Sequence, residues 1–234
     1  NAGLNAREKK DNTSWTSTIE NIQKTAKKSS LLEFTATIDL NNKAIAQKYE
    51  KHLLYKYDLK EFRRDKYSKD VLFHLVDSDV STRMLQAILI SQFRKKIALK
   101  NGINLKPLIM FKSQKIAESK GNLDSFLDLL TNLSVQQIVA QRELAQDGIL
   151  KQAFDFFDQS GLSDQDLIAE LQEDFRLERL LLIDGKNKTS NNLVELNTLE
   201  NPENEIRAIF AVDMLNEGWD VLNLFDIVRL YDTR

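Results

Sequence analysis

The chain has 234 residues, 42% of them hydrophobic, so it can bury the core of one large α/β domain, or of one domain and part of another. It contains no cysteine, which excludes disulfides and thiolate metal sites and fits a reducing, cytoplasmic location. No run of about 18 apolar residues occurs, so we expect no membrane-spanning helix.

The formal net charge of −2 conceals an uneven distribution along the chain. Residues 1–120 hold 24 Lys and Arg against 13 Asp and Glu, whereas residues 121–234 hold 9 against 22. Solvated helix faces that happen to segregate would explain this difference. The functional alternative is that the basic half faces a polyanion, while the acidic half points away from it or contacts another protein.

Apolar runs of strand length alternate with helical patterns, and several of these runs lack the period-two alternation of a half-exposed strand. This order predicts an α/β fold with a mostly parallel, doubly wound sheet. The predicted strands lie at residues 31–36, 71–76, 108–111, 180–183, 206–212 and 225–230.

The helical patterns are more regular than the strands. Residues 79–100 have apolar side chains spaced three and four apart, with Asp79 or Ser78 as the N-cap and Asn101-Gly102 as the stop. Residues 122–176 show only amphipathic helical pattern, with breaks near Gly148 and Gly161. We therefore expect a helical insertion there, and the turn-rich residues 184–192 predict an exposed loop.

Several common chemical motifs are absent from the sequence. Gly185-Lys186 lacks both the earlier glycine and the following Ser or Thr of a phosphate-binding loop. The only histidines, His52 and His74, stand alone, which favours core-edge or surface roles over metal binding or acid–base work. We therefore predict no metal site in this chain.

Three segments go beyond a generic α/β pattern. One ends an apolar strand with Thr35-Ala36-Thr37, and another ends the strand at Phe111-Lys112-Ser113. The third is a strand that opens into the polar turn Asn216-Glu217-Gly218-Trp219-Asp220. A glycine at a strand end lets a phosphate approach backbone N–H groups that a Cβ atom would block, so this turn predicts an anion contact.

In this order, the three segments resemble motifs III, IV and V of superfamily 2 helicase-like ATPases. Residues 210–221 resemble the motif V form of the Res (restriction) subunit of type III restriction enzymes. The resemblance implies a second RecA-like lobe in which Thr35, Ala36 and Thr37 couple the two lobes. It also implies that Gly218 and its neighbours contact the nucleic-acid backbone or the nucleotide, and that Asp220 faces the ATP ribose or the water network.

Two of these assignments have structural alternatives. Thr35 and Thr37 could form a strand-end turn satisfied by their own hydroxyl groups. Trp219 is adjacent to Val221 and Leu222, which favours packing over base stacking.

The resemblance divides the chain into a remnant of the first lobe at residues 1–50, a connector at 51–78, and the second lobe at 79–234 with a helical insertion at 121–178. The Walker A and B motifs would precede residue 1, and motif VI would follow residue 234. ATP and Mg²⁺ are therefore expected to serve a full-length parent, a DNA-dependent ATPase, helicase or restriction-enzyme motor, and this chain alone is expected to be inactive.

The implied partners are the DNA backbone, contacted without sequence preference, the first RecA-like lobe, and a methyltransferase subunit. The competing interpretation is a non-catalytic α/β protein-interaction scaffold with an acidic helical insertion.

Overall fold

The computed structural model describes residues 17–26, 28–35, 38–74, 78–183, 190–212 and 221–231. The chain divides into two units, one up to Val71 and one from Leu72 onward. Each unit is described separately below.

The first unit is made of short helices joined by extended segments. Residues 17–25 are helical. Helix α2 (Lys43–Tyr49) starts at the N-cap Asn42, a short 3-10 helix (Glu50–His52) follows it, and α3 (Leu59–Arg64) comes next. Among the described residues of this unit no hydrophobic side chain is buried. The unit therefore has no core of its own in the part of the chain that the structure describes.

Two strands predicted in the N-terminal half, at 31–36 and 71–76, are not strands in the parts that the structure describes. Residues 31–35 and 71–74 adopt no regular secondary structure. A strand is stabilised by hydrogen bonds to a neighbouring strand, and no described segment pairs with either run. Their apolar composition alone was therefore a misleading signal.

The second unit begins with α4 (Val80–Lys100), which is capped by the carboxylate of Asp79 and ends as predicted. Gly102 has a φ of +73°, and the N–H of Ile103 donates to the carbonyl of Ala98 at 2.9 Å. This left-handed C-terminal turn is what the sequence Asn101-Gly102 indicates.

A four-stranded parallel sheet follows α4, with the strand order β2-β3-β1-β4. The central strand β1 pairs with both β3 and β4, so β2 and β4 are the edges. The strands are β1 (Leu108–Ser113), β2 (Leu180–Ile183), β3 (Ala208–Val212) and β4 (Leu224–Arg229). The prediction of a mostly parallel, doubly wound RecA-like sheet is confirmed.

The predicted helical insertion connects β1 to β2. It contains four helices, with breaks at Gly148 and Gly161 as expected and a further break after Thr131. The helices are α5 (Ile116–Thr131), α6 (Val135–Leu144), α7 (Gly148–Gln159) and α8 (Asp164–Asp174).

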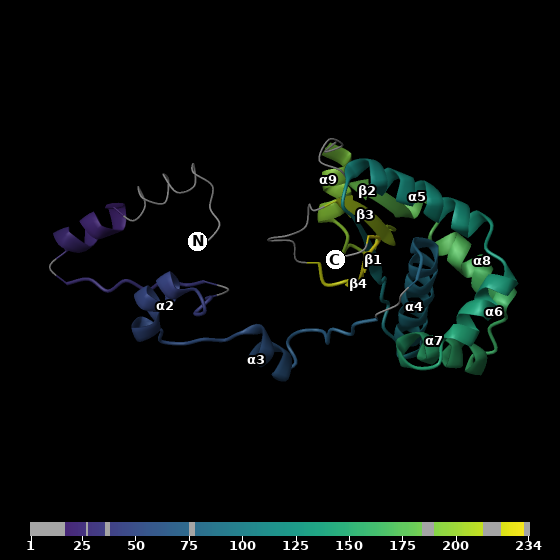
Figure 1. Cartoon of the computed structure of the whole chain (residues 1–234), viewed down its shortest axis with the longest axis horizontal. Coiled ribbons are helices and arrows are strands. Elements are labelled where there is room, and N and C mark those ends of the chain that lie inside the picture. Colours follow the sequence, from purple (N-terminus) through teal and green to yellow (C-terminus); the bar gives the residue numbers. More distant parts are fainter. Residues whose placement is uncertain are drawn as a thin grey trace. The chain divides into compact units, whose positions relative to one another are not determined.

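Helices cover both faces of the parallel sheet because successive crossover connections move across the sheet in opposite directions. The path from β1 to β2 runs one way and the path from β2 to β3 runs back, so right-handed crossovers put their helices on opposite faces. Figure 1 shows α4 to α8 on one side of the sheet and α9 (Ser190–Asn197) on the other. The predicted loop at 184–192 needs correction at its end, since Ser190 begins α9; residues 184–189 lie outside the described residues.

The insertion shares one hydrophobic core with α4 and the sheet. Phe111 of β1 and Phe210 of β3 stack with ring centroids 4.9 Å apart, and Phe126 of α5 lies 5.5 Å from Phe210. All three side chains are fully buried. The helical insertion is therefore integral to this unit rather than a separately folded attachment.

A buried cluster of charged side chains lies at the amino ends of the strands. Arg207, just before β3, is buried and donates to Asp174 at the end of α8, to the carbonyl of Pro107 and to the hydroxyl of Ser91. Asp174 also accepts from Lys95 of α4. The cluster ties α4 and α8 to the sheet at the edge opposite Ser113, which ends β1.

No helix in the described part of the chain is long and apolar enough to cross a membrane.

Candidate functional site

The carboxyl ends of β1 and β3 form the place in this fold best suited to ligand binding. The two strands are neighbours, and their last residues, Ser113 and Val212, are register partners. After β1 the chain crosses to β2, whereas after β3 it crosses the other way to β4. Parallel α/β sheets bind ligands at such a switch point, in the crevice outside the carboxyl ends of the strands.

The predicted motif IV residues lie at this edge. Phe111 is fully buried in the core, Lys112 is partly buried, and Ser113 is buried. The side-chain amide of Asn122, in α5, donates to the Ser113 hydroxyl at 2.9 Å. Phe111 therefore anchors the strand, while the second turn of α5 orients the hydroxyl of Ser113.

The first turns of α5 follow directly from β1. Lys115 is the N-cap residue, and its exposed ammonium pairs with Glu118 at 3.2 Å. Ser119 is fully buried, and its hydroxyl has no hydrogen-bond partner in the part of the chain that the structure describes. Exposed N–H groups and the helix dipole favour negative charge at such a helix start.

Beyond β3, the chain reaches the opposite edge of the sheet before β4 begins. The carbonyl of Asn223 accepts from Leu108 N–H at 2.8 Å, at the amino end of β1. The side chain of Asn223 donates to the carbonyl of Leu199, and the N–H of Leu222 donates to the Glu200 carboxylate. The chain just before β4 is thus held by hydrogen bonds to β1 and to the residues after α9.

At the carboxyl end of the edge strand, Arg229 is paired in register with Lys112. The guanidinium of Arg83, at the start of α4, donates to the carbonyl of Arg229 at 3.2 Å and to that of Ser78 at 2.8 Å. Cationic side chains therefore come to this edge from β1, β4 and α4.

The predicted motif V residues, Asn216, Glu217, Gly218, Trp219 and Asp220, lie outside the described residues. So do Ala36 and Thr37 of the predicted motif III, whereas Thr35 is exposed and lies in no helix or strand. Motif IV and the strand leading into motif V are brought together by the sheet. Motif III belongs to the other unit.

The two histidines have different surroundings. His74 Nε2 lies 2.9 Å from the Gln86 side-chain oxygen, and the Gln86 amide donates to Gln141 at 2.8 Å. His52 is exposed at the end of the 3-10 helix. Within the described ranges no three His, Asp or Glu side chains are grouped to hold a metal ion.

Sequence reasoning missed two features. Asn122, which positions Ser113, is an ordinary polar helix residue without a motif that would single it out. Residues 55–67 carry aromatic rings interleaved with basic side chains, and this interleaving is visible in the sequence as a nucleic-acid signal.

Comparison with known proteins supports the family resemblance. The chain is 36% identical over 224 residues to the probable type III restriction-modification enzyme HindVIP Res subunit of Haemophilus influenzae. The match covers 86% of this chain and 43% of that relative's length. No family model matches the chain, and no solved structure matches it. The resemblance to the Res subunit of a type III restriction enzyme is therefore confirmed over most of this chain.

Proposed function

We propose that this chain supplies the second RecA-like lobe of an ATP-driven DNA motor of the type III restriction kind. In this proposal residues 79–234 form that lobe, residues 51–78 lead into it, and residues 1–50 belong to the first lobe. Support comes from the likeness to a Res subunit and from the RecA-like sheet.

The observation that carries the proposal is the register of β1 and β3. Ser113 and Val212 end adjacent strands at the switch point, so motif IV and the chain leading into motif V start from the same edge of the sheet. Phosphate groups bind at such edges because backbone N–H groups and helix starts face them. Lys112, Lys115 and Arg229 contribute positive charge nearby.

Each motif has a distinct role in the proposed motor. Backbone N–H groups near Gly218 contact a phosphate of DNA or of the nucleotide, and Asp220 faces the ribose or the water network. Lys112, which is only partly buried, steadies the DNA backbone, and buried Ser113 holds the end of β1 in place. Contacts of this kind position a nucleic acid without reading its sequence, which a translocating enzyme requires.

ATP and Mg²⁺ are proposed to act in the full-length parent, between this lobe and the first. Hydrolysis would change the separation of the lobes while each of them holds the DNA backbone. A methyltransferase subunit is the proposed further partner, because the relative is named as part of a restriction-modification enzyme.

DNA-stimulated ATP hydrolysis by the full-length parent tests the proposal. Gly218→Val should abolish the stimulated rate and leave the circular dichroism spectrum unchanged, because its Cβ would block the approach of a phosphate. Gly121→Val is the matched control, since Gly121 lies in α5 with open space around the added Cβ. Normal DNA-stimulated turnover by Gly218→Val would overturn the motif V assignment.

The scaffold interpretation makes the opposite prediction for the same assay. If the parent shows no DNA-stimulated turnover, while the acidic helical insertion captures a protein partner, the motor proposal is wrong. The shared core of α4, the insertion and the sheet is compatible with either role.

A further inference from the structure

Four aromatic rings form a connected group in the first unit. Tyr55 and Tyr57 stack with centroids 6.2 Å apart, Tyr57 meets the edge of Phe62 at 6.1 Å, and Phe62 lies 5.6 Å from Tyr67. The outer rings are open to solvent, because Tyr55 is 77% and Tyr67 70% exposed. We call these four residues the aromatic row.

Local hydrogen bonds hold the row in place. Asp58 and Glu61 form a capping box at the start of α3, and Tyr67 N–H donates to the carbonyl of Phe62 at 3.1 Å, just after α3 ends. The hydroxyl of Tyr57 donates to Asp65 at 2.8 Å. Three of the four rings are thus positioned by contacts within about ten residues of sequence, in a unit that otherwise lacks buried hydrophobic side chains among its described residues.

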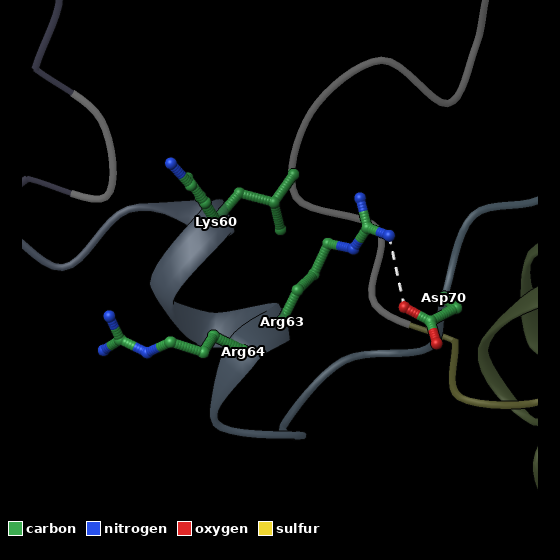
Figure 2. A pocket seen from close by; sticks show the side chains of 5 residues that line it. Lys60, Arg63, Arg64 and Asp70 are labelled. Atoms are coloured by element: carbon green, nitrogen blue, oxygen red, sulfur yellow. Dashed lines mark hydrogen bonds and ion pairs between the residues drawn. The ribbon is translucent and has the colours of Figure 1, made fainter.

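Basic side chains project from the same short helix. Figure 2 shows Lys60, Arg63 and Arg64 around an open hollow of about 490 Å³ that Leu59 and Asp70 also line. Arg63 pairs with Asp70 at 3.1 Å, while Lys60 has no ion-pair partner among the described residues. Residues 51–70 hold seven Lys and Arg against four Asp and Glu, so the segment carries a net positive charge.

We propose that the aromatic row and these cations bind single-stranded DNA. Unpaired bases stack on exposed aromatic rings whatever their sequence, and cations beside the rings attract the phosphates. A duplex offers the same phosphates, but its bases are already stacked on one another. The inference deepens the proposed function, because it names a DNA-binding segment separate from the carboxyl edge of the sheet and the form of DNA that it selects.

A protein partner would be the other use of an exposed apolar row. Positive charge favours the nucleic acid, because Lys60, Arg63 and Arg64 come from α3, the same short helix that carries Phe62 of the aromatic row. Binding to a protein through the rings alone would not depend on the number of free cations, so charge variants separate the two uses.

The experiment measures fluorescence anisotropy of a labelled oligothymidine, and of a duplex of the same length, with the whole chain at 50 mM salt. Tyr55→Ala and Tyr67→Ala should each weaken single-strand binding by about five-fold or more, with little effect on the duplex. Phe34→Ala is the control, because Phe34 is 91% exposed in the same unit and outside the row. Equal losses for single strand and duplex, or none, would overturn the proposal.

A second variant tests the charge component by a gain of affinity. Asp70→Asn frees Arg63 from the one carboxylate that pairs with it in the described part of the chain, so single-strand binding should tighten and the slope of log K against log salt should steepen by about 0.7, the value for one added phosphate contact. Asp155→Asn is the control for the change in net charge, because Asp155 also pairs with a solvent-exposed cation, Lys151, and lies on α7. Equal effects of Asp70→Asn and Asp155→Asn would mean that only net charge matters and would contradict the site.

These results are separable from the proposed function. If the aromatic variants bind normally while Gly218→Val abolishes DNA-stimulated turnover in the parent, the aromatic row is wrong and the motor stands. If the aromatic variants lose single-strand binding while the parent shows no such turnover, the row stands without the motor. Salt-independent self-association of the chain through residues 55–67 would show that the aromatic row binds another copy of the chain instead of DNA, and would contradict the proposal.

Discussion

Arg207 donates to Asp174 across 2.5 Å, and the two side chains are only 3% and 9% exposed. Their surroundings are unequal. Asp174 also pairs with Lys95 at 2.5 Å and with Arg179 at 3.2 Å, whereas Asp174 is the only carboxylate that pairs with Arg207 in the described part of the chain. Removing one member of a buried pair leaves the other as an uncompensated charge, and the loss is greater when the member left behind has no other partner.

Asp174→Asn should therefore destabilise the chain more than Arg207→Met. We expect a loss of about 3–5 kcal/mol in the free energy of unfolding for Asp174→Asn, measured by urea denaturation at pH 7. Arg207→Met leaves Asp174 with two cations and keeps an apolar contact with Phe175, so its loss should be smaller. Lys151→Ala, which removes an exposed pair, should change stability by less than about 0.5 kcal/mol.

Lys106 lies beside this cluster and gives a prediction about pH. Its partial burial and the positive charge of Arg207 lower its pKa to about 8, against the opposing pull of Glu205. Below pH 8 both the folded and the unfolded chain hold the proton. Between pH 8 and about 10.5 only the unfolded chain holds it, so the free energy of unfolding rises with pH in this window.

Lys106→Met removes the titrating group. The free energy of unfolding in urea should therefore rise more steeply with pH for the wild-type chain than for the variant between pH 8 and about 10.5. The difference in slope should correspond to up to about one additional proton bound by the unfolded chain. Parallel curves would show that Lys106 titrates near its ordinary value. Glu143→Gln, an exposed change in α6, serves as a control for shared alkaline effects.

Sequence pattern was sufficient where one segment determines its own structure. Helix α4 begins at Asp79 and stops at Asn101-Gly102 because cap and stop chemistry act within a few residues. Strands β1, β2 and β3 were found because apolar runs covered on both faces lack alternation, and the partly exposed edge strand β4 was found from its apolar run alone. Residues 31–36 have the same composition and are not a strand where described, because a strand also needs a partner, which composition does not reveal.

The candidate site was accessible from sequence only in part. Motif resemblance selected Phe111, Lys112 and Ser113. These residues lie next to the end of β3 because β1 pairs with β3, and the sequence did not specify that strand order. Asn122 was missed because its contact with Ser113 arises from the angle between β1 and α5. The interleaved composition of residues 55–67 is visible in the sequence, but the contacts between the rings are not, because Tyr67 reaches Phe62 only through the turn after α3.

Two glycines provide a matched test of the helical framework. Gly102 has a φ of +73° and Gly121 has an ordinary helical backbone, while an added Cβ would have open space at both. Gly102→Ala should lower the unfolding free energy by about 1 kcal/mol, because the left-handed turn disfavours a side chain. Gly121→Ala should raise it by about 0.5–1 kcal/mol, because alanine favours the interior of a helix. Equal signs for the two variants would contradict the turn after α4.

The last prediction is that this chain, purified alone, hydrolyses no ATP. Phosphoryl transfer is catalysed by positioning and by charge, and the sequence offers neither a phosphate-binding loop nor an acidic run to hold Mg²⁺, since Gly185-Lys186 lacks the flanking residues of such a loop.

A correctly placed Gly218 or Asp220 would not compensate, because each of these elements is worth several powers of ten in rate. If motif VI lies outside this chain, supplying the first lobe in trans should restore only a small fraction of the turnover. The arginine of that motif acts on the transferring phosphate and contributes about 10³ to 10⁵ to the rate by itself. The measurement is a coupled ATPase assay on the chain, with and without DNA, against a boiled sample. DNA-stimulated turnover well above the boiled sample would mean that the chain holds a complete nucleotide site, and its assignment as one lobe of a two-lobe motor would then fail.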